Sequence, residues 1–153
     1  MTENETILLV DDSENDLILM RRAFSKAEFH NPLREVRNGE EAIAYLQGEG
    51  IYDDRDQFPF PVVMILDLNM PRLNGFEVLS WVQTQTQPIL KHLSIIILTA
   101  SVRMEDVERA YDLGAHSFLV KPASMEKLVA MIRCLRDWLQ YNHFPPLNET
   151  VRR

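Results

Sequence analysis

Four short and nearly continuous apolar runs constrain the fold more than any other feature of this sequence. They occupy residues 7–10 (ILLV), 62–66 (VVMIL), 95–98 (IIIL) and 117–120 (SFLV). Their residues do not alternate with polar ones, which is typical of strands buried on both faces of a parallel sheet. A fifth run, LREV at residues 33–36, is more polar and predicts a strand at the edge of the sheet.

Helical patterns lie between these runs. Apolar residues recur at helical spacing in segments with expected limits of 17–27, 40–46, 76–83, 105–113 and 124–139. The repeated alternation of strand and helix predicts a doubly wound α/β fold, (βα)5, with a parallel five-stranded sheet in the flavodoxin-like order 2-1-3-4-5. Ser124 is expected to cap the last helix, and Asp12 or Ser13 the first.

The length and charge of the chain exclude several classes of protein. Its 153 residues suit one domain, and its net charge of −7, without a large cluster of Lys and Arg, argues against a nucleic-acid partner. No apolar run approaches the roughly 20 residues of a membrane span, and the N-terminus does not resemble a secretion signal. Cys134 is the only cysteine, which favours a reducing, cytoplasmic location. It lies in an apolar helical pattern, so it is expected to be buried.

Two segments exceed the minimal alternation of strands and helices. Residues 48–61 are polar and end in proline, and they are expected to form a surface loop. Residues 140–153 contain paired prolines and are expected to form a non-helical tail. Trp138, Tyr141 and Phe144 supply more aromatic surface than a solvated tail needs, so we expect them to pack against the domain or a partner.

Polar or small residues directly follow each of the four apolar runs. In chain order they are Asp11 and Asp12, Asp67, Thr99 with Ala100, and Lys121 with Pro122. Ligands of open α/β sheets bind beyond the carboxyl ends of the strands, so we expect these residues to gather in one site. Taken singly, a strand-end Asp is more often a helix cap and a strand-end Lys a solvated charge. Their joint placement favours a functional site.

The chemistry of that site follows from its charges. Three gathered carboxylates repel one another unless a cation is present, and Mg²⁺ prefers such oxygen ligands. Lys121 adds a fixed positive charge, and together these groups suit a phosphoryl group. Asp67 is then the expected nucleophile and becomes an aspartyl phosphate, while the Thr99 hydroxyl reaches a phosphoryl oxygen. This reactivity explains why a carboxylate ends so apolar a run as residues 62–66.

Four motifs together resemble the receiver domain of two-component response regulators. They are DD after the first strand, D-x-N-M-P-x-x-x-G after the third, T-A after the fourth and K-P after the fifth. The resemblance covers residues 5–139. It implies that Asp67 is the phosphoacceptor and that Lys121 and Thr99 bind the phosphoryl group. It also implies a cis Lys121–Pro122 peptide bond. The implied ligands of Mg²⁺ are Asp11, Asp12, Asp67 and the main-chain carbonyl of Asn69.

Four residues complete the implied phosphoryl-binding and switch region: Ala100, Asn69, Ser101 and Phe118. Asn69 and Ser101 flank the approach of an attacking water, so we expect them to tune the lifetime of the phosphoryl group. The family often has a Tyr three residues before the Lys. This chain has Phe118 there, which predicts switching by ring position without a hydrogen bond.

The resemblance also implies partners. A sensor histidine kinase is the expected phosphodonor, and the chain would catalyse only its own phosphorylation and dephosphorylation, so it is not an enzyme in the usual sense. No output domain is expected after the receiver domain. The 48–61 loop and the aromatic tail resemble single-domain regulators that partner bacterial phytochromes. Met125, Val129 and Trp138 lie off the core stripe of the last helix, which predicts a homodimer through the fourth helix, fifth strand, fifth helix and tail.

Three rival interpretations are weaker. A phosphatase of the haloacid dehalogenase type needs a second Asp two residues after the nucleophile, where this chain has Asn69, and its nucleophile lies on the first strand. A Rossmann-type nucleotide-binding domain needs a Gly-rich turn where this chain has DDSEND. A pseudo-receiver, which serves as an interaction scaffold without phosphorylation, remains the alternative, although the intact set of Asp67, Thr99 and Lys121 argues against it.

Overall fold

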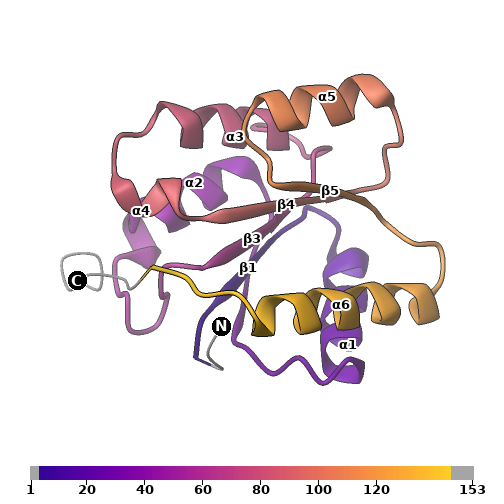
Figure 1. Ribbon diagram of the computed structural model, residues 1–153. Helices are drawn as coiled ribbons and strands as arrows, with labels where there is room; N and C mark the ends of the chain where they lie inside the picture. The colour runs from indigo at the N-terminus through magenta and orange to yellow at the C-terminus, as the bar shows by residue number, and fades with distance from the viewer. Residues whose placement is uncertain (1–3, 146–153) are drawn as a thin grey trace.

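A parallel β-sheet forms the centre of the molecule in the computed structural model, which describes residues 4–145 (Figure 1). Its five strands within these residues are β1 (Ile7–Val10), β2 (Leu33–Val36), β3 (Val63–Leu66), β4 (Ser94–Thr99) and β5 (Ser117–Val120). They lie in the order β2-β1-β3-β4-β5, so the predicted fold class and strand order are confirmed. The more polar strand β2 lies at an edge, as its sequence predicted.

Helices connect successive strands. The described α-helices are α1 (Glu14–Lys26), α2 (Gly39–Gln47), α3 (Gly75–Thr84), α4 (Pro88–Lys91), α5 (Met104–Asp112) and α6 (Met125–Gln140). The short helix α4 was not predicted, because one turn is too short to show a helical period. The fourth and fifth helices expected from the sequence are therefore α5 and α6.

The helices cover both faces of the sheet and enclose two separate apolar clusters. Helices α1 and α6 cover one face, where Phe24 and Ile132 are almost fully buried (Figure 1). Helices α2, α3 and α5 cover the other face, where Tyr45 and Leu79 are almost fully buried. Burial on both faces explains why β1, β3 and β4 are continuous apolar runs. The run at residues 117–120 was expected to be buried in the same way, but β5 lies at the edge of the sheet and is only partly buried.

Polar side chains cap the longer helices and fix where they begin. Ser13 accepts a hydrogen bond from the Asp16 N–H at the start of α1, and Ser124 accepts one from Lys127 at the start of α6. Asn74 and Glu77 form a capping box at α3. Each cap satisfies a backbone donor that the helix leaves free. The predicted cap at Ser124 is confirmed, and Ser13 rather than Asp12 caps α1.

The register of the sheet brings the strand ends to one level. Val10 pairs with Leu66, and Leu66 pairs with Ile97. The backbone ladder continues one residue further, since Asp67 N–H donates to Val10 O at 2.9 Å and Lys121 N–H donates to Thr99 O at 2.8 Å. The polar residues that follow the strands are thus held by the sheet itself.

The segment at residues 48–61 is a packed connection and not merely the polar surface loop that its composition predicted. It contains the 3-10 turn η1 (Gly50–Tyr52), and Phe60 is buried in the cluster beneath α2. The Arg55 guanidinium donates to the carbonyls of Tyr45, Leu46 and Phe58 at 2.7–3.2 Å. The bonds to Tyr45 and Leu46 meet carbonyls of the last turn of α2, and the bond to Phe58 ties the segment to that helix end.

Two expectations about the C-terminal third were wrong. Cys134 is exposed, because on a helix of about 3.6 residues per turn it points away from the buried stripe that includes Ile132 and Leu135. The Lys121–Pro122 peptide bond is trans, the form that a proline peptide also prefers intrinsically.

The aromatic residues near the C-terminus divide between core and solvent. Phe144 packs partly buried against the cluster beneath α1 and α6, as predicted. Trp138 and Tyr141 are exposed. Residues 146–153 of the predicted tail lie outside the described residues. Within residues 4–145, no helix has the length and apolar character to cross a membrane.

The buried Tyr45 predicts a loss of stability at high pH. Burial raises the pKa of its phenol from 10.0 to about 12. Its contribution is therefore complete below pH 10 and is lost as the pH rises towards 12. Between about pH 9 and pH 11, this one group should lower the free energy of unfolding by about 1 kcal/mol. Urea unfolding of wild type and Tyr45→Phe at both pH values checks this, and equal losses in the two proteins would contradict it.

Candidate functional site

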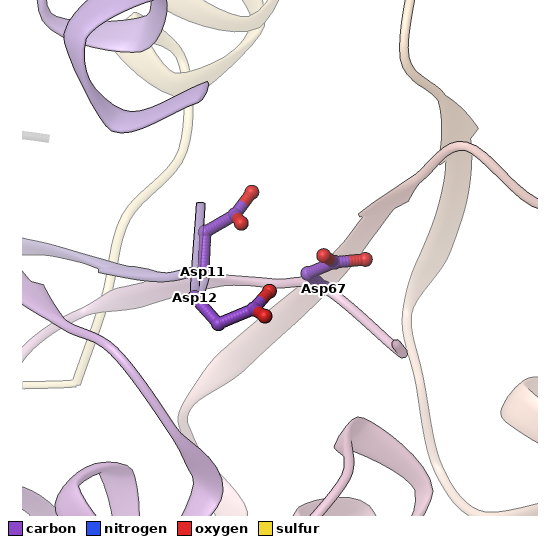
Figure 2. A group of neighbouring side chains, drawn as sticks. All are labelled: Asp11, Asp12 and Asp67. Atoms are coloured by element: carbon purple, nitrogen blue, oxygen red, sulfur yellow. The ribbon is translucent and has the colours of Figure 1, made fainter. Parts of the chain in front are cut away.

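Three carboxylates meet at the carboxyl ends of β1 and β3. One oxygen each from Asp11, Asp12 and Asp67 lies within 4.8 Å of the others, and the side chains project into the same space (Figure 2). Asp11 and Asp67 are buried, each with 6% of its surface exposed, whereas Asp12 is exposed. The structure thus brings together the three carboxylates that the sequence predicted as metal ligands.

Lys121 reaches this cluster from the end of β5, across β4 and β3. Its Nζ donates to Asp11 Oδ2 at 2.7 Å and lies 3.4 Å from Asp67 Oδ2. It also donates to Asp16 Oδ2 at 2.8 Å. Asp16 was missed from the sequence because it lies inside the first turn of α1 and not at a strand end. An acidic residue three positions after the Ser13 cap looks like a capping-box partner and carries no sign of a role in the site.

Burial and hydrogen bonds set the charges in the site. Burial raises the pKa of Asp11, although hydrogen bonds from Lys121 and the Ser13 N–H oppose this shift. Burial disfavours the charged form of Lys121, but its hydrogen bonds to Asp11 and Asp16, with the charge of Asp67, outweigh burial and raise the Lys121 pKa. The ammonium is thus firmly charged and partly compensates a cluster with excess negative charge.

Thr99 contributes a buried hydroxyl at the end of β4. The residue is fully buried, and its Oγ1 has no hydrogen-bond partner among the described residues. A buried hydroxyl left without a partner costs about 1–3 kcal/mol. The Thr6 hydroxyl before β1 is in the same condition, so it is the position of Thr99 at a strand end of the site that gives its hydroxyl a role. It is available to donate to an oxygen of a bound ligand.

The loop between β3 and α3 is shaped by close backbone contacts. A Cβ atom on Gly75 would lie 2.5 Å from the Asp67 carbonyl oxygen, so only glycine fits there. Gly39 N–H donates to Leu73 O at 3.1 Å, which docks the loop against the start of α2. The exposed Asn69 lies in this loop, and its N–H approaches Asp67 Oδ1 at 3.4 Å.

The other predicted site residues lie in the β4–α5 loop and on β5. Ala100 is exposed, while Phe118 is half-buried and packs against the cluster beneath α2, α3 and α5. The Ser101 hydroxyl donates to Asp106 Oδ2 at 2.6 Å, so in this structure it is turned to its own loop and helix.

The sequence was compared with known protein families and proteins. The model of the response regulator receiver domain matches residues 7–133. The chain belongs to this family. Its sequence is 32% identical over 137 residues to the response regulator Rcp1 of a Synechocystis strain, covering 89% of this chain and 90% of Rcp1.

Solved structures of receiver domains have the same fold. A response regulator in red light signaling of R. palustris matches with a TM-score of 0.86 and 32% identity, covering 94% of this chain and 99% of that one. The phosphorylated cyanobacterial phytochrome response regulator RcpA matches with a TM-score of 0.83 and 30% identity at the same coverage. The Mn²⁺-bound form of Rcp1 matches with a TM-score of 0.79 and 31% identity, covering 93% and 99%.

The donor set fits a hard divalent cation. Asp11, Asp12 and Asp67 offer carboxylate oxygens only, and oxygen is the ligand atom that Mg²⁺ and Mn²⁺ prefer. The exposed position of Asp12 leaves one side of the cluster open to water, which Mg²⁺ retains in its coordination shell.

The exposed Asp12 allows the metal site to be weakened without unfolding the protein. Asp12→Asn should raise the Mn²⁺ dissociation constant by roughly tenfold or more, because it removes a ligand charge. Isothermal titration calorimetry measures this. Glu14→Gln removes the same charge from the first turn of α1, where Glu14 pairs with Arg37, and serves as the control. An Mn²⁺ affinity that falls equally in both variants would contradict direct binding by Asp12.

Proposed function

We propose that the chain accepts a phosphoryl group on Asp67 from a sensor histidine kinase and signals through phosphorylation-dependent protein contacts. The observation that supports this most is the buried Asp67 carboxylate, which lies beside the acidic pair of β1 and 3.4 Å from Lys121 Nζ. A nucleophile, a cation site and a fixed positive charge thus converge at one strand end.

The chemistry is an in-line displacement at phosphorus. An Asp67 Oδ atom forms the new P–O bond while the bond from phosphorus to the donor breaks, and the leaving group keeps the electron pair. A bound Mg²⁺ supplies charge neutralisation at the phosphoryl oxygens. Lys121 provides the second positive charge, and Thr99 donates its free hydroxyl to a phosphoryl oxygen. The Asn69 carbonyl completes the metal ligands.

The remaining predicted residues act after phosphoryl transfer. The small Ala100 leaves room beside the phosphoryl group, and Asn69 and Ser101 tune the access of water to it. For Ser101, this requires that its hydroxyl leave Asp106. When Thr99 moves towards the phosphoryl group, the Phe118 ring changes its position. The domain thereby shifts between two packed states.

The proposed partners follow from relatives and surface. Two of the similar structures are a phytochrome response regulator and a response regulator in red light signaling, which supports a phytochrome-type kinase as the donor. The net charge of −7 argues against a nucleic-acid partner. We place the receiver domain at residues 5–139, with residues 140–153 as a tail, and the protein in the cytoplasm.

Homodimerisation through α5, β5, α6 and the tail is part of this proposal, with a changed set of residues. Val129 is buried and Met125 packs against the core, so neither forms the apolar patch expected from the sequence. Exposed apolar side chains on α5 and the loop before it, on β5 and on α6 support the dimer instead: Val102, Met104, Val120 and Trp138.

Intact mass spectrometry after incubation with acetyl phosphate tests the function. With Mg²⁺, wild type should gain one phosphoryl adduct that hydroxylamine removes, whereas Asp67→Asn and an EDTA-treated sample should gain none. Thr99→Ala should form the adduct far more slowly, because it loses a donor to the phosphoryl oxygen. Absence of an adduct on folded wild type would favour the pseudo-receiver scaffold.

A further inference from the structure

Lys121 contacts Asp16, a residue that the sequence analysis did not place in the site. Lys121 Nζ donates to Asp16 Oδ2 at 2.8 Å and to Asp11 Oδ2 at 2.7 Å, so the two carboxylates hold the ammonium almost equally. Asp11 belongs to the metal cluster, whereas Asp16 does not. The ammonium therefore bridges one metal ligand and one carboxylate outside the cluster.

The first turn of α1 leaves the Asp16 side chain available for this contact. In a capping box, the acidic residue at this position accepts a hydrogen bond from the backbone N–H of the cap. Here the Ser13 N–H donates instead to Asp11 Oδ1 at 2.9 Å. Ser13 Oγ still accepts from the Asp16 N–H at 3.2 Å, which fixes the backbone from which Asp16 reaches Lys121.

A divalent cation held by Asp11, Asp12 and Asp67 would compete with Lys121 for the Asp11 carboxylate. It would repel the ammonium and draw electron density from the oxygens that now accept from Lys121. The contact between Lys121 and Asp11 would then weaken. With 19% of its side chain exposed, Lys121 is too enclosed to leave its charge unpaired without a cost. Asp16, with 36% of its side chain exposed, remains as the acceptor.

We propose that Asp16 is a positioning residue that holds the Lys121 ammonium beside Asp67 when a divalent cation takes Asp11. This inference rests on the proposed function, because it explains how the metal and Lys121 can serve one phosphoryl group together. An ammonium carries three donors. One stays on Asp16, and the others become free for phosphoryl oxygens at Asp67.

A double-mutant cycle on Mn²⁺ affinity tests the proposal, with Mn²⁺ alone as the probe and isothermal titration calorimetry as the measurement. Asp16→Asn is close to isosteric and removes the charge. It should raise the Mn²⁺ dissociation constant roughly fivefold or more, because Lys121 then stays on Asp11. Lys121→Met should lower the constant. In that background, Asp16→Asn should change it no more than Glu14→Gln does, since no ammonium is left to hold.

The outcomes separate three roles for Asp16. An equal loss of affinity with and without Lys121 would show a direct ligand or a general charge effect and would overturn the proposal. No loss in either background would also overturn it. If Lys121→Met does not fold, as judged by circular dichroism, Lys121→Gln replaces it in the cycle.

The Mn²⁺ titration requires no phosphoryl transfer. It can therefore contradict the role of Asp16 in a protein whose Asp67 is phosphorylated normally, and it can support that role in a protein that accepts no phosphoryl group. A second measurement connects the two. With acetyl phosphate and saturating Mg²⁺, Asp16→Asn should still be phosphorylated more slowly than wild type, by roughly threefold or more. An unchanged rate at saturating metal would contradict the claim that Asp16 places Lys121 beside Asp67.

Discussion

The ammonium of Lys121 balances the charges on which the rest of the site depends. It brings the end of β5 into contact with carboxylates from β1, α1 and β3. Burying these carboxylates without a cation would cost several kcal/mol or force some of them to take up protons. A single side chain thus couples the edge strand β5 to the inner strands β1 and β3 and offsets part of the negative charge at the carboxyl edge of the sheet.

Lys121 neutralises only part of the negative charge in the site, and the remaining negative charge suits the site to binding a cation. Asp11, Asp12 and Asp67 together carry more negative charge than Lys121 supplies, so a divalent cation is attracted. In the proposed function, a bound cation would leave a local charge that favours a dianionic phosphoryl group. The hydroxyl of Thr99, which has no partner within residues 4–145, adds a donor at the same strand ends. In this proposal the excess negative charge favours the cation, and the bound cation in turn favours the phosphoryl group.

The backbone holds this arrangement with little freedom. The ladder bonds at Asp67 and Lys121 continue the sheet into the site, and the Gly75 contact fixes the loop that follows Asp67. A cluster on such a rigid frame loses little conformational entropy when a ligand binds.

Sequence reasoning predicted the features that depend on strands. Buried parallel strands have a distinctive apolar pattern, and their order places Asp11, Asp67, Thr99 and Lys121 at one edge. It failed where the outcome depends on which way a side chain points. Cys134 was expected to be buried and is exposed, whereas Val129 was expected on the outer face of its helix and is buried. The pattern of apolar residues did not define which face of the helix packs against the sheet.

Asp16 shows a different limit. Its contact with Lys121 joins residues 105 positions apart, and its local sequence already has a sufficient explanation as the first turn of a helix. Likewise, the packing of residues 48–61 depends on Arg55 reaching the end of α2, which composition does not predict. Local patterns locate elements well, but such long side-chain contacts emerge only from the assembled fold.

The most direct test of this account is the stability of Lys121→Met with and without Mg²⁺. In EDTA the variant should unfold at lower urea concentration than wild type, because its carboxylates lose their cation. Saturating Mg²⁺ should stabilise the variant more than it stabilises wild type, since the metal then replaces the missing charge without competition. A variant as stable as wild type in EDTA, with no greater gain from Mg²⁺, would contradict the claim that Lys121 balances the site.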